Sequence, residues 1–132
     1  MTYKVWKPEL TNVYASAQIG DGTTIGAFSE IGDGVIIGKN CKIQNGVFIP
    51  KGVTIGDNVF LGPRVCFTND RYPSAKEYGK FEETVVEDGA SIGACAVIRC
   101  GIRIGANSLI GAGSVVTHDV PPGVTIKGNP AK

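Results

Sequence analysis

The chain has 132 residues, a length typical of one domain, and its 13 basic and 12 acidic side chains leave a formal net charge of +1. This balance argues against nucleic acid or an anionic membrane as a partner. No apolar segment approaches the ~20 residues needed to cross a bilayer, and the N-terminus lacks the apolar region of a signal peptide, so we expect a cytoplasmic protein.

Residues 1–12, which include Tyr3 and Trp6, precede a long series of repeats, and we expect them to cap it. From residue 13 onward, apolar side chains recur at every sixth position. They form two series: Val13, Ile19, Ile25, Ile31, Ile37, Ile43, Ile49, Ile55, Leu61 and Phe67, then Val86, Ile92, Ile98, Ile104, Ile110 and Val116. Neither an α-helix nor an alternating strand has a period of six, and a short fixed period indicates a solenoid. The six-residue unit is that of a parallel β-helix.

A small or β-branched residue stands four places after the aliphatic residues of these series, as at Thr23, Val47 and Val59. Because side chains alternate along a strand, both positions face the same side, which must be the interior. Gly, Asn and Asp between them suit sharp corners. Three hexads make one triangular coil, so residues 13–67 and 85–119 predict an all-β fold of about five coils.

The period is interrupted once, between residues 68 and 84, where a charged segment is inserted. Such an insertion in a regular solenoid is usually functional, so we expect a protruding loop there, although a tolerated surface excursion remains an alternative. Residues 120–132 form a C-terminal tail, and all five segments belong to one domain.

Two features resemble a known family. The hexads, the single loop and the ending Asp119-Val-Pro-Pro-Gly-Val followed by Gly-Asn-Pro-Ala-Lys132 resemble the left-handed β-helix acyltransferases. The run Phe67-Thr-Asn-Asp-Arg-Tyr-Pro73 is more specific and resembles the nucleotide-linked amino-sugar N-acetyltransferases. The resemblance covers nearly the whole chain. It implies left-handed coils, a homotrimer, acetyl-CoA bound in the groove between neighbouring columns, and an acceptor sugar near the loop.

The single histidine allows an independent test of this resemblance. Relatives that acetylate hydroxyl groups commonly use a histidine base, whereas this chain has only His118, far along the sequence from the loop. A hydroxyl group needs a positioned base during attack, but an amine with a pKa of about 8 is already partly neutral at pH 7. We therefore expect N-acetylation by direct attack. Two alternatives stay open, namely O-acetylation with Asp70 as the base and a non-catalytic assembly module.

The loop supplies the candidate acceptor site. Asn69 and Asp70 are the expected catalytic residues, since an amide can donate to and accept from an amine and a carboxylate can take its proton. An Asx-turn for Asn69 and an exposed pair of Asp70 with Arg71 are the structural alternatives. Arg64, Phe67 and Tyr72 are expected to bind the substrate, with Arg64 on phosphate and Tyr72 stacking.

Small residues and backbone amides suit the pantetheine arm of CoA. Gly93, Ala94, Gly111 and Ala112 are the candidates, and Lys127 suits the CoA phosphates, although corner packing and a solvated lysine would explain them equally. The cysteines (Cys41, Cys66, Cys95 and Cys100) lack C-x-x-C spacing. With a single histidine they argue against a zinc site, so we expect reduced thiols, no metal and no acetyl-cysteine intermediate.

Overall fold

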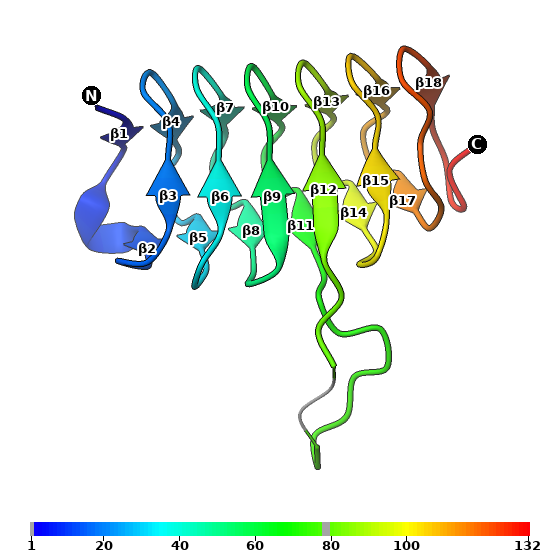
Figure 1. Cartoon of the computed structure of the whole chain (residues 1–132), viewed down its shortest axis with the longest axis horizontal. Coiled ribbons are helices and arrows are strands. Elements are labelled where there is room, and N and C mark those ends of the chain that lie inside the picture. Colours follow the sequence, from blue (N-terminus) through cyan, green and yellow to red (C-terminus); the bar gives the residue numbers. More distant parts are fainter. Residues whose placement is uncertain (1, 78–79) are drawn as a thin grey trace.

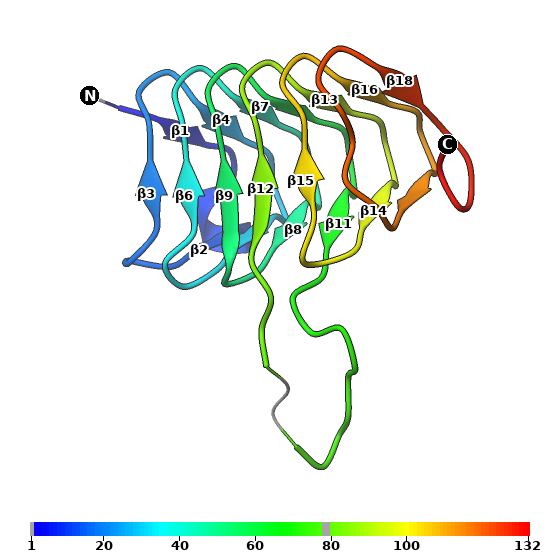
Figure 2. The ribbon, with the colours of Figure 1, turned by 45° about the vertical axis from the view of Figure 1, so that its right-hand side comes forward.

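The computed structural model describes residues 2–77 and 80–132, and shows a three-sided column with one long projection (Figures 1 and 2). Within these residues, short parallel strands form three sheets that run the length of the column. Sheet A has the order β1 (Lys4–Val5), β4 (Thr24–Ile25), β7 (Lys42–Ile43), β10 (Phe60–Leu61), β13 (Ser91–Ile92), β16 (Leu109–Ile110) and β18 (Thr125–Ile126). Sheet B has the order β2 (Asn12–Val13), β5 (Glu30–Ile31), β8 (Phe48–Ile49), β11 (Cys66–Phe67), β14 (Val97–Ile98) and β17 (Val115–Val116). Sheet C has the order β3 (Gln18–Ile19), β6 (Ile36–Ile37), β9 (Val53–Ile55), β12 (Thr84–Val86) and β15 (Arg103–Ile104).

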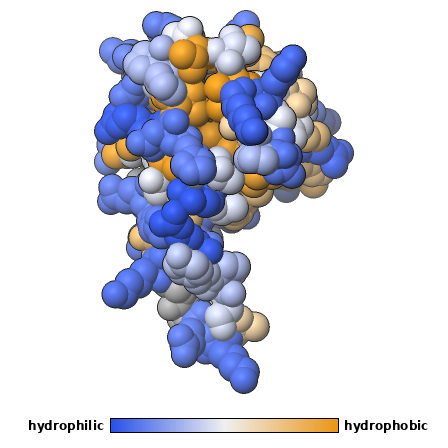
Figure 3. Space-filling model, turned by 90° about the vertical axis from the view of Figure 1, so that its right-hand side faces the viewer, coloured by the Kyte–Doolittle hydropathy of each residue, from blue (hydrophilic) through white to orange (hydrophobic). Residues whose placement is uncertain are grey.

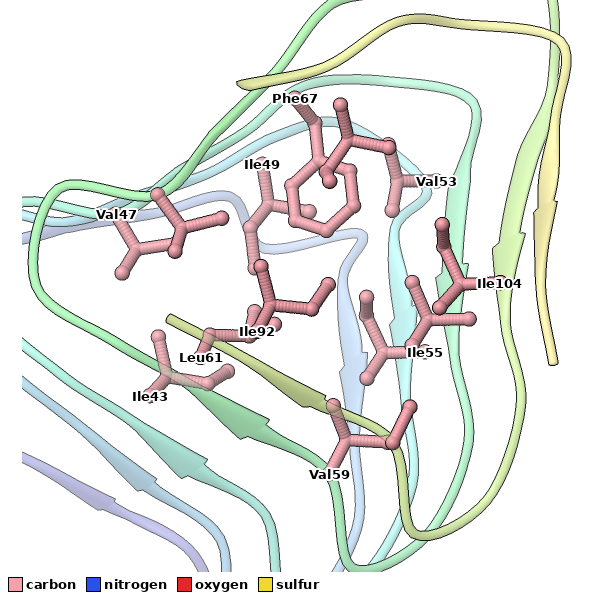
Figure 4. Packing of buried hydrophobic residues seen from close by; sticks show 14 of the residues in the cluster. Ile43, Val47, Ile49, Val53, Ile55, Val59, Leu61, Phe67, Ile92 and Ile104 are labelled. Atoms are coloured by element: carbon pink, nitrogen blue, oxygen red, sulfur yellow. The ribbon is translucent and has the colours of Figure 1, made fainter. Parts of the chain in front are cut away.

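The register of the strands places similar residues of successive coils above one another. Ile25 pairs with Ile43 and Ile43 with Leu61. The sixth-position side chains are buried except at the ends, and Figure 4 shows Ile43 and Leu61 in the interior. In Figure 1 the chain rises through β3, β6 and β9 in front and descends behind as it advances from left to right, which is left-handed winding. The all-β, parallel, left-handed β-helix predicted from the sequence is confirmed.

The column is longer than the five coils predicted, because both ends of the chain join it. In the segments expected as cap and tail, β1 pairs with β4 and β18 pairs with β16, so the column has about seven turns. The sequence signal was weak there because the end coils are irregular: the 3-10 helix η1 (Pro8–Leu10) breaks the first, and Pro121-Pro122 the last. Viewed from the C-terminal end, an apolar surface remains visible at the centre (Figure 3). Val124 and Ile126 of the last coil pack against the core and are only partly buried.

The strands are joined at three rows of corners, which we name by the sheets that they connect. AB corners comprise residues 6–11, 26–29, 44–47, 62–65, 93–96 and 111–114. BC corners comprise residues 14–17, 32–35, 50–52, 68–83, 99–102 and 117–119. CA corners comprise residues 20–23, 38–41, 56–59, 87–90, 105–108 and 121–124. Each row stacks into one edge of the prism, so residues 18 positions apart become neighbours.

The projection is the enlarged BC corner between β11 and β12. Its base is closed by an antiparallel bridge between Asp70 and Phe81 and by the Glu82 N–H, which donates to the Asn69 carbonyl at 3.0 Å. Thr84, the last residue of the predicted loop, is buried and already belongs to β12. Residues 78–79 of that loop lie outside the described residues. The only helix in the described part of the chain is the three-residue η1, so no helix there has the length and apolarity that membrane spanning requires.

Candidate active site on two edges of the column

The predicted site residues separate onto two edges of the prism. Asn69, Asp70 and Tyr72 lie on the BC edge, in the projection, whereas the five predicted CoA residues follow the AB edge. Sheet B lies between these edges. In each coil a strand of sheet B separates the AB corner from the BC corner, as β14 separates residues 93–96 from residues 99–102. One chain therefore does not bring the two groups together.

On the BC edge, the side chains of Asn69 and Asp70 organise the base of the projection. Asn69 Nδ2 donates to the Lys51 carbonyl, one coil earlier, at 2.9 Å. Asp70 Oδ1 accepts from the Tyr72 N–H at 3.1 Å, which is an Asx-turn. Arg71 Nη1 forms an ion pair with Glu82 Oε1 at 3.6 Å. The structural alternative, an exposed pair of Asp70 with Arg71, is therefore not what the structure shows. Asn69 and Asp70 are thus held in fixed positions where the projection leaves the column.

The predicted substrate-binding trio is not assembled as expected. Phe67 is fully buried inside the column (Figure 4), so its side chain has no surface to offer a ligand and this prediction is wrong. Phe67 occupies the inward sixth position of the repeat. It was nevertheless assigned to the substrate because it is also the first residue of the motif that runs into the loop. Tyr72 is 81% exposed on the projection, whereas Arg64 lies at an AB corner on the other side of sheet B.

The AB edge unites all five predicted CoA residues. A Cβ placed on Gly93 would lie 2.6 Å from the Ala112 nitrogen, and one on Gly111 would lie 2.9 Å from the Lys127 Cβ. Only glycine allows coils to stack this closely, so the strip is nearly bare backbone that ends at the exposed Lys127. It is narrow, small-featured and cationic at one end, which fits a pantetheine arm and its phosphates.

Not every amide on this strip is available to a ligand. The Gly93 N–H donates to the Ile110 carbonyl at 2.8 Å and the Gly111 N–H to the Ile126 carbonyl at 2.9 Å. Among the described residues, the Ala94 and Ala112 N–H groups make no such bond. Those two amides are therefore the candidate donors to a bound carbonyl.

Backbone strain marks the AB edge, and sequence reasoning missed it. On the CA and BC edges the corner residues with positive φ are glycine or asparagine. On the AB edge the same conformation is adopted by Lys7 (φ 52), Phe28 (φ 66), Arg64 (φ 61) and Cys95 (φ 61). Each such residue costs about 1–2 kcal/mol, and strain of this kind concentrates at functional sites. Aligning the hexads by their corner positions would have revealed these departures.

Other reactive groups fit the site less well. Burial raises the pKa of the Cys41 thiol and that of the Cys66 thiol, which makes both poor nucleophiles at neutral pH. All four cysteines are unpaired, and the described residues hold no cluster of three metal-binding side chains. His118 is exposed, with Nδ1 3.0 Å from Thr117 Oγ1. It lies on the BC edge two coils beyond the projection, or about 10 Å at the spacing of stacked strands.

Comparison with known proteins also identifies hexapeptide repeats in this chain. Residues 16–51 and 83–118 match the model of the bacterial transferase hexapeptide (six repeats), and residues 52–67 match that of the hexapeptide repeat of succinyl-transferase. A 2,3,4,5-tetrahydropyridine-2,6-dicarboxylate N-acetyltransferase from Clostridium perfringens is 54% identical over 48 residues, which are 36% of this chain and 20% of that protein. The chain thus spans about a fifth of the curated relatives that it matches.

Two solved structures are similar over almost the whole chain. PerB from Caulobacter crescentus, in complex with CoA and GDP-perosamine, has a TM-score of 0.81 at 28% identity, covering 93% of this chain and 53% of PerB. The N-acyltransferase AntD from Bacillus cereus, in complex with dTDP and 3-hydroxybutyryl-CoA, has a TM-score of 0.87 at 18% identity, covering 97% of this chain and 76% of AntD. Family models cover more than half of the sequence, and with the hexad period and the three-sheet column they place this chain in the bacterial transferase hexapeptide family.

Proposed function

We propose that the protein is an acetyl-CoA-dependent N-acetyltransferase that acts on the amino group of a nucleotide-linked amino sugar. The observation that carries the proposal is the strip on the AB edge, where Gly93, Ala94, Gly111 and Ala112 lead to Lys127. PerB, a perosamine N-acetyltransferase similar over 93% of the chain, supports the same chemistry.

A homotrimer would complete the site. The outer face of sheet B, between the two edges, carries a stacked apolar ladder of Phe48, Cys66, Val97 and Val115. Packing this face against a second copy would set the BC edge of one chain beside the AB edge of its neighbour. The projection with Asn69 would then face the strip that binds CoA, and a three-fold arrangement would form three such sites.

An aspartate on this ladder should separate the subunits. We expect Val97→Asp to weaken association at least 100-fold, because an unpaired charge buried at an interface costs several kcal/mol. Light scattering coupled to gel filtration would measure the mass. Ser91→Asp, at the outward position of the preceding strand on sheet A, is the matched control and should leave the mass unchanged. An unaltered Val97→Asp oligomer would place the interface elsewhere.

The reaction needs positioning more than acid–base chemistry. Acetyl-CoA supplies an activated acetyl group, and the neutral acceptor amine attacks its carbonyl carbon. The C–N bond forms, the C–S bond breaks, CoA leaves as the thiolate, and the nitrogen loses one proton. In this proposal the Ala94 and Ala112 N–H groups donate to that carbonyl oxygen, Asn69 orients the amine, and Asp70 receives its proton. No histidine base is required, because the amine nucleophile brings its own lone pair.

A thiol-reactive dye would report CoA release with a panel of nucleotide-linked amino sugars, and product mass would identify the acetylated atom. We expect an amide product and an unchanged rate for His118→Ala. The second candidate is O-acetylation, with Asp70 in the projection as the base or with His118, which lies on the same BC edge two coils further on. If CoA were released only with hydroxyl acceptors, and if His118→Ala abolished that release, O-acetylation would replace N-acetylation as the proposed function.

A further inference from the structure

The N-terminal half of the AB edge carries aromatic side chains that acetyl transfer does not need. Trp6 is 53% exposed, Leu10 is 50% exposed and Phe28 is 67% exposed, all at AB corners. They line a hollow of about 420 Å³ with Lys7, Ala27 and Asn45. Exposed aromatic surface beside a cation is typical of a site for a flat ligand.

A second hollow continues from the first toward the C-terminus. Its volume is about 510 Å³, and Phe28 and Asn45 line both. Phe28, Gly46 and Arg64 occupy the same corner position in three successive coils, so Phe28 and Arg64 stand about 10 Å apart along the edge. Gly46 has no side chain, and a Cβ there would lie 3.3 Å from Arg64 Cγ. The hollow therefore exists because a glycine separates an aromatic ring from a guanidinium group.

The stability of the column does not explain these residues. Phe28 is mostly exposed, so it gains little by burial, and its positive φ costs about 1–2 kcal/mol. Arg64 is exposed as well and carries the same strain. Glycine serves this corner position at residues 46 and 113. The protein thus keeps an aromatic ring and a guanidinium group at these corners although the positive φ is unfavourable. This indicates a ligand that contacts both side chains.

We propose that this hollow binds the nucleotide of the acceptor, with its base stacked on Phe28, its ribose over Gly46 and its diphosphate beside Arg64. The Asn45 and Gln44 amides are placed to hydrogen-bond the edge of the base, and Lys7 adds positive charge. The identity of the sugar in this complex rests on the proposed function; the nucleotide site itself does not.

The order of residues along the edge supports this assignment. The CoA strip begins at Gly93 and runs toward the C-terminus, whereas the hollow ends at Arg64 and runs toward the N-terminus. The two meet at the coils of the 62–65 and 93–96 corners, and the projection leaves the BC edge in the first of these coils. A base on Phe28 would place a sugar beyond the diphosphate about 15 Å further along, at the level of the acetyl group.

Trp6 is the only tryptophan in the chain, so its fluorescence reports on this edge directly. We expect dTDP, UDP or GDP, without sugar or acetyl-CoA, to quench it on binding to the full chain. Phe28→Gly and Arg64→Gly should each weaken nucleotide affinity at least tenfold. Their thermal midpoints should be unchanged or raised, because glycine relieves the positive φ. Asn58→Gly, at the corresponding corner on the CA edge, is the control and should alter neither quantity.

Kinetics separate this site from the proposed function. We expect both variants to raise KM for the nucleotide-linked amino sugar at least tenfold and to leave KM for acetyl-CoA within twofold. Acetyl transfer with an unchanged acceptor KM in Phe28→Gly, Arg64→Gly and Phe28→Leu would overturn the nucleotide site but not the function. If the protein bound nucleotide through Phe28 and Arg64 but transferred no acetyl group, the nucleotide site would stand and the proposed function would be overturned. A change of oligomeric mass in Phe28→Gly would assign the hollow to subunit contact instead and also overturn the site.

Discussion

Replacing Asn69 by alanine should lower kcat/KM for the acceptor by a factor of about 100 to 1,000. Its side-chain Nδ2 donates to the Lys51 carbonyl at the base of the projection, and the backbone carbonyl of Asn69 accepts from the Glu82 N–H. Alanine removes the anchor and the amide that would meet the amine. Losing one preorganised polar group, or misplacing a reactant by about 1 Å, costs 10²-fold or more in rate.

Steady-state kinetics with both substrates would test this expectation, with Gln18→Ala as the control. Gln18 is an exposed amide at the start of β3 on sheet C, three coils before the projection, and its loss should change neither kcat nor KM. A loss mainly in kcat would indicate a contact made during the reaction. A loss mainly in acceptor KM would indicate that Asn69 shapes the projection. Unaltered kinetics in Asn69→Ala would remove this residue from the site.

Alanine at Gly38 should destabilise the column by about 3 kcal/mol, near the upper end of the usual cost of overpacking. A Cβ there would lie 2.6 Å from the carbonyl carbon of Gly56 in the next coil and 2.2 Å from Asp57 Oδ1. The coils cannot separate locally, because all three sheets hold them at about 4.8 Å. The clash must therefore be relieved by distorting backbone hydrogen bonds.

Gly34 provides the matched comparison. It has a φ of +70°, and a Cβ there meets no heavy atom within 4 Å, so alanine at this site suffers only the conformational penalty of about 1–2 kcal/mol. Denaturant midpoints of the two variants and the wild type would separate steric from conformational cost. Equal losses in Gly34→Ala and Gly38→Ala would show that coil spacing is not what glycine protects at Gly38.

The AB edge shows which part of the candidate site the sequence reasoning missed. The residues at 93–94 and 111–112 could be proposed because small residues with backbone amides suit a pantetheine arm, and the fold places them in one strip with Lys127. The sequence analysis did not connect Phe28 with Arg64, because the two residues are 36 positions apart. They are neighbours in space only because two coils of 18 residues bring equivalent corners above one another.

The sequence by itself determined the architecture, because a side chain that must face inward at every sixth position leaves a periodic record that local chemistry can read. It also located the single projection, since an insertion interrupts that period. Tertiary structure alone decided that the candidate acceptor residues and the candidate CoA residues occupy different edges, and that both termini contribute strands. Such facts depend on which coil lies above which, and stacking relates residues far apart in the chain through contacts that no local pattern encodes.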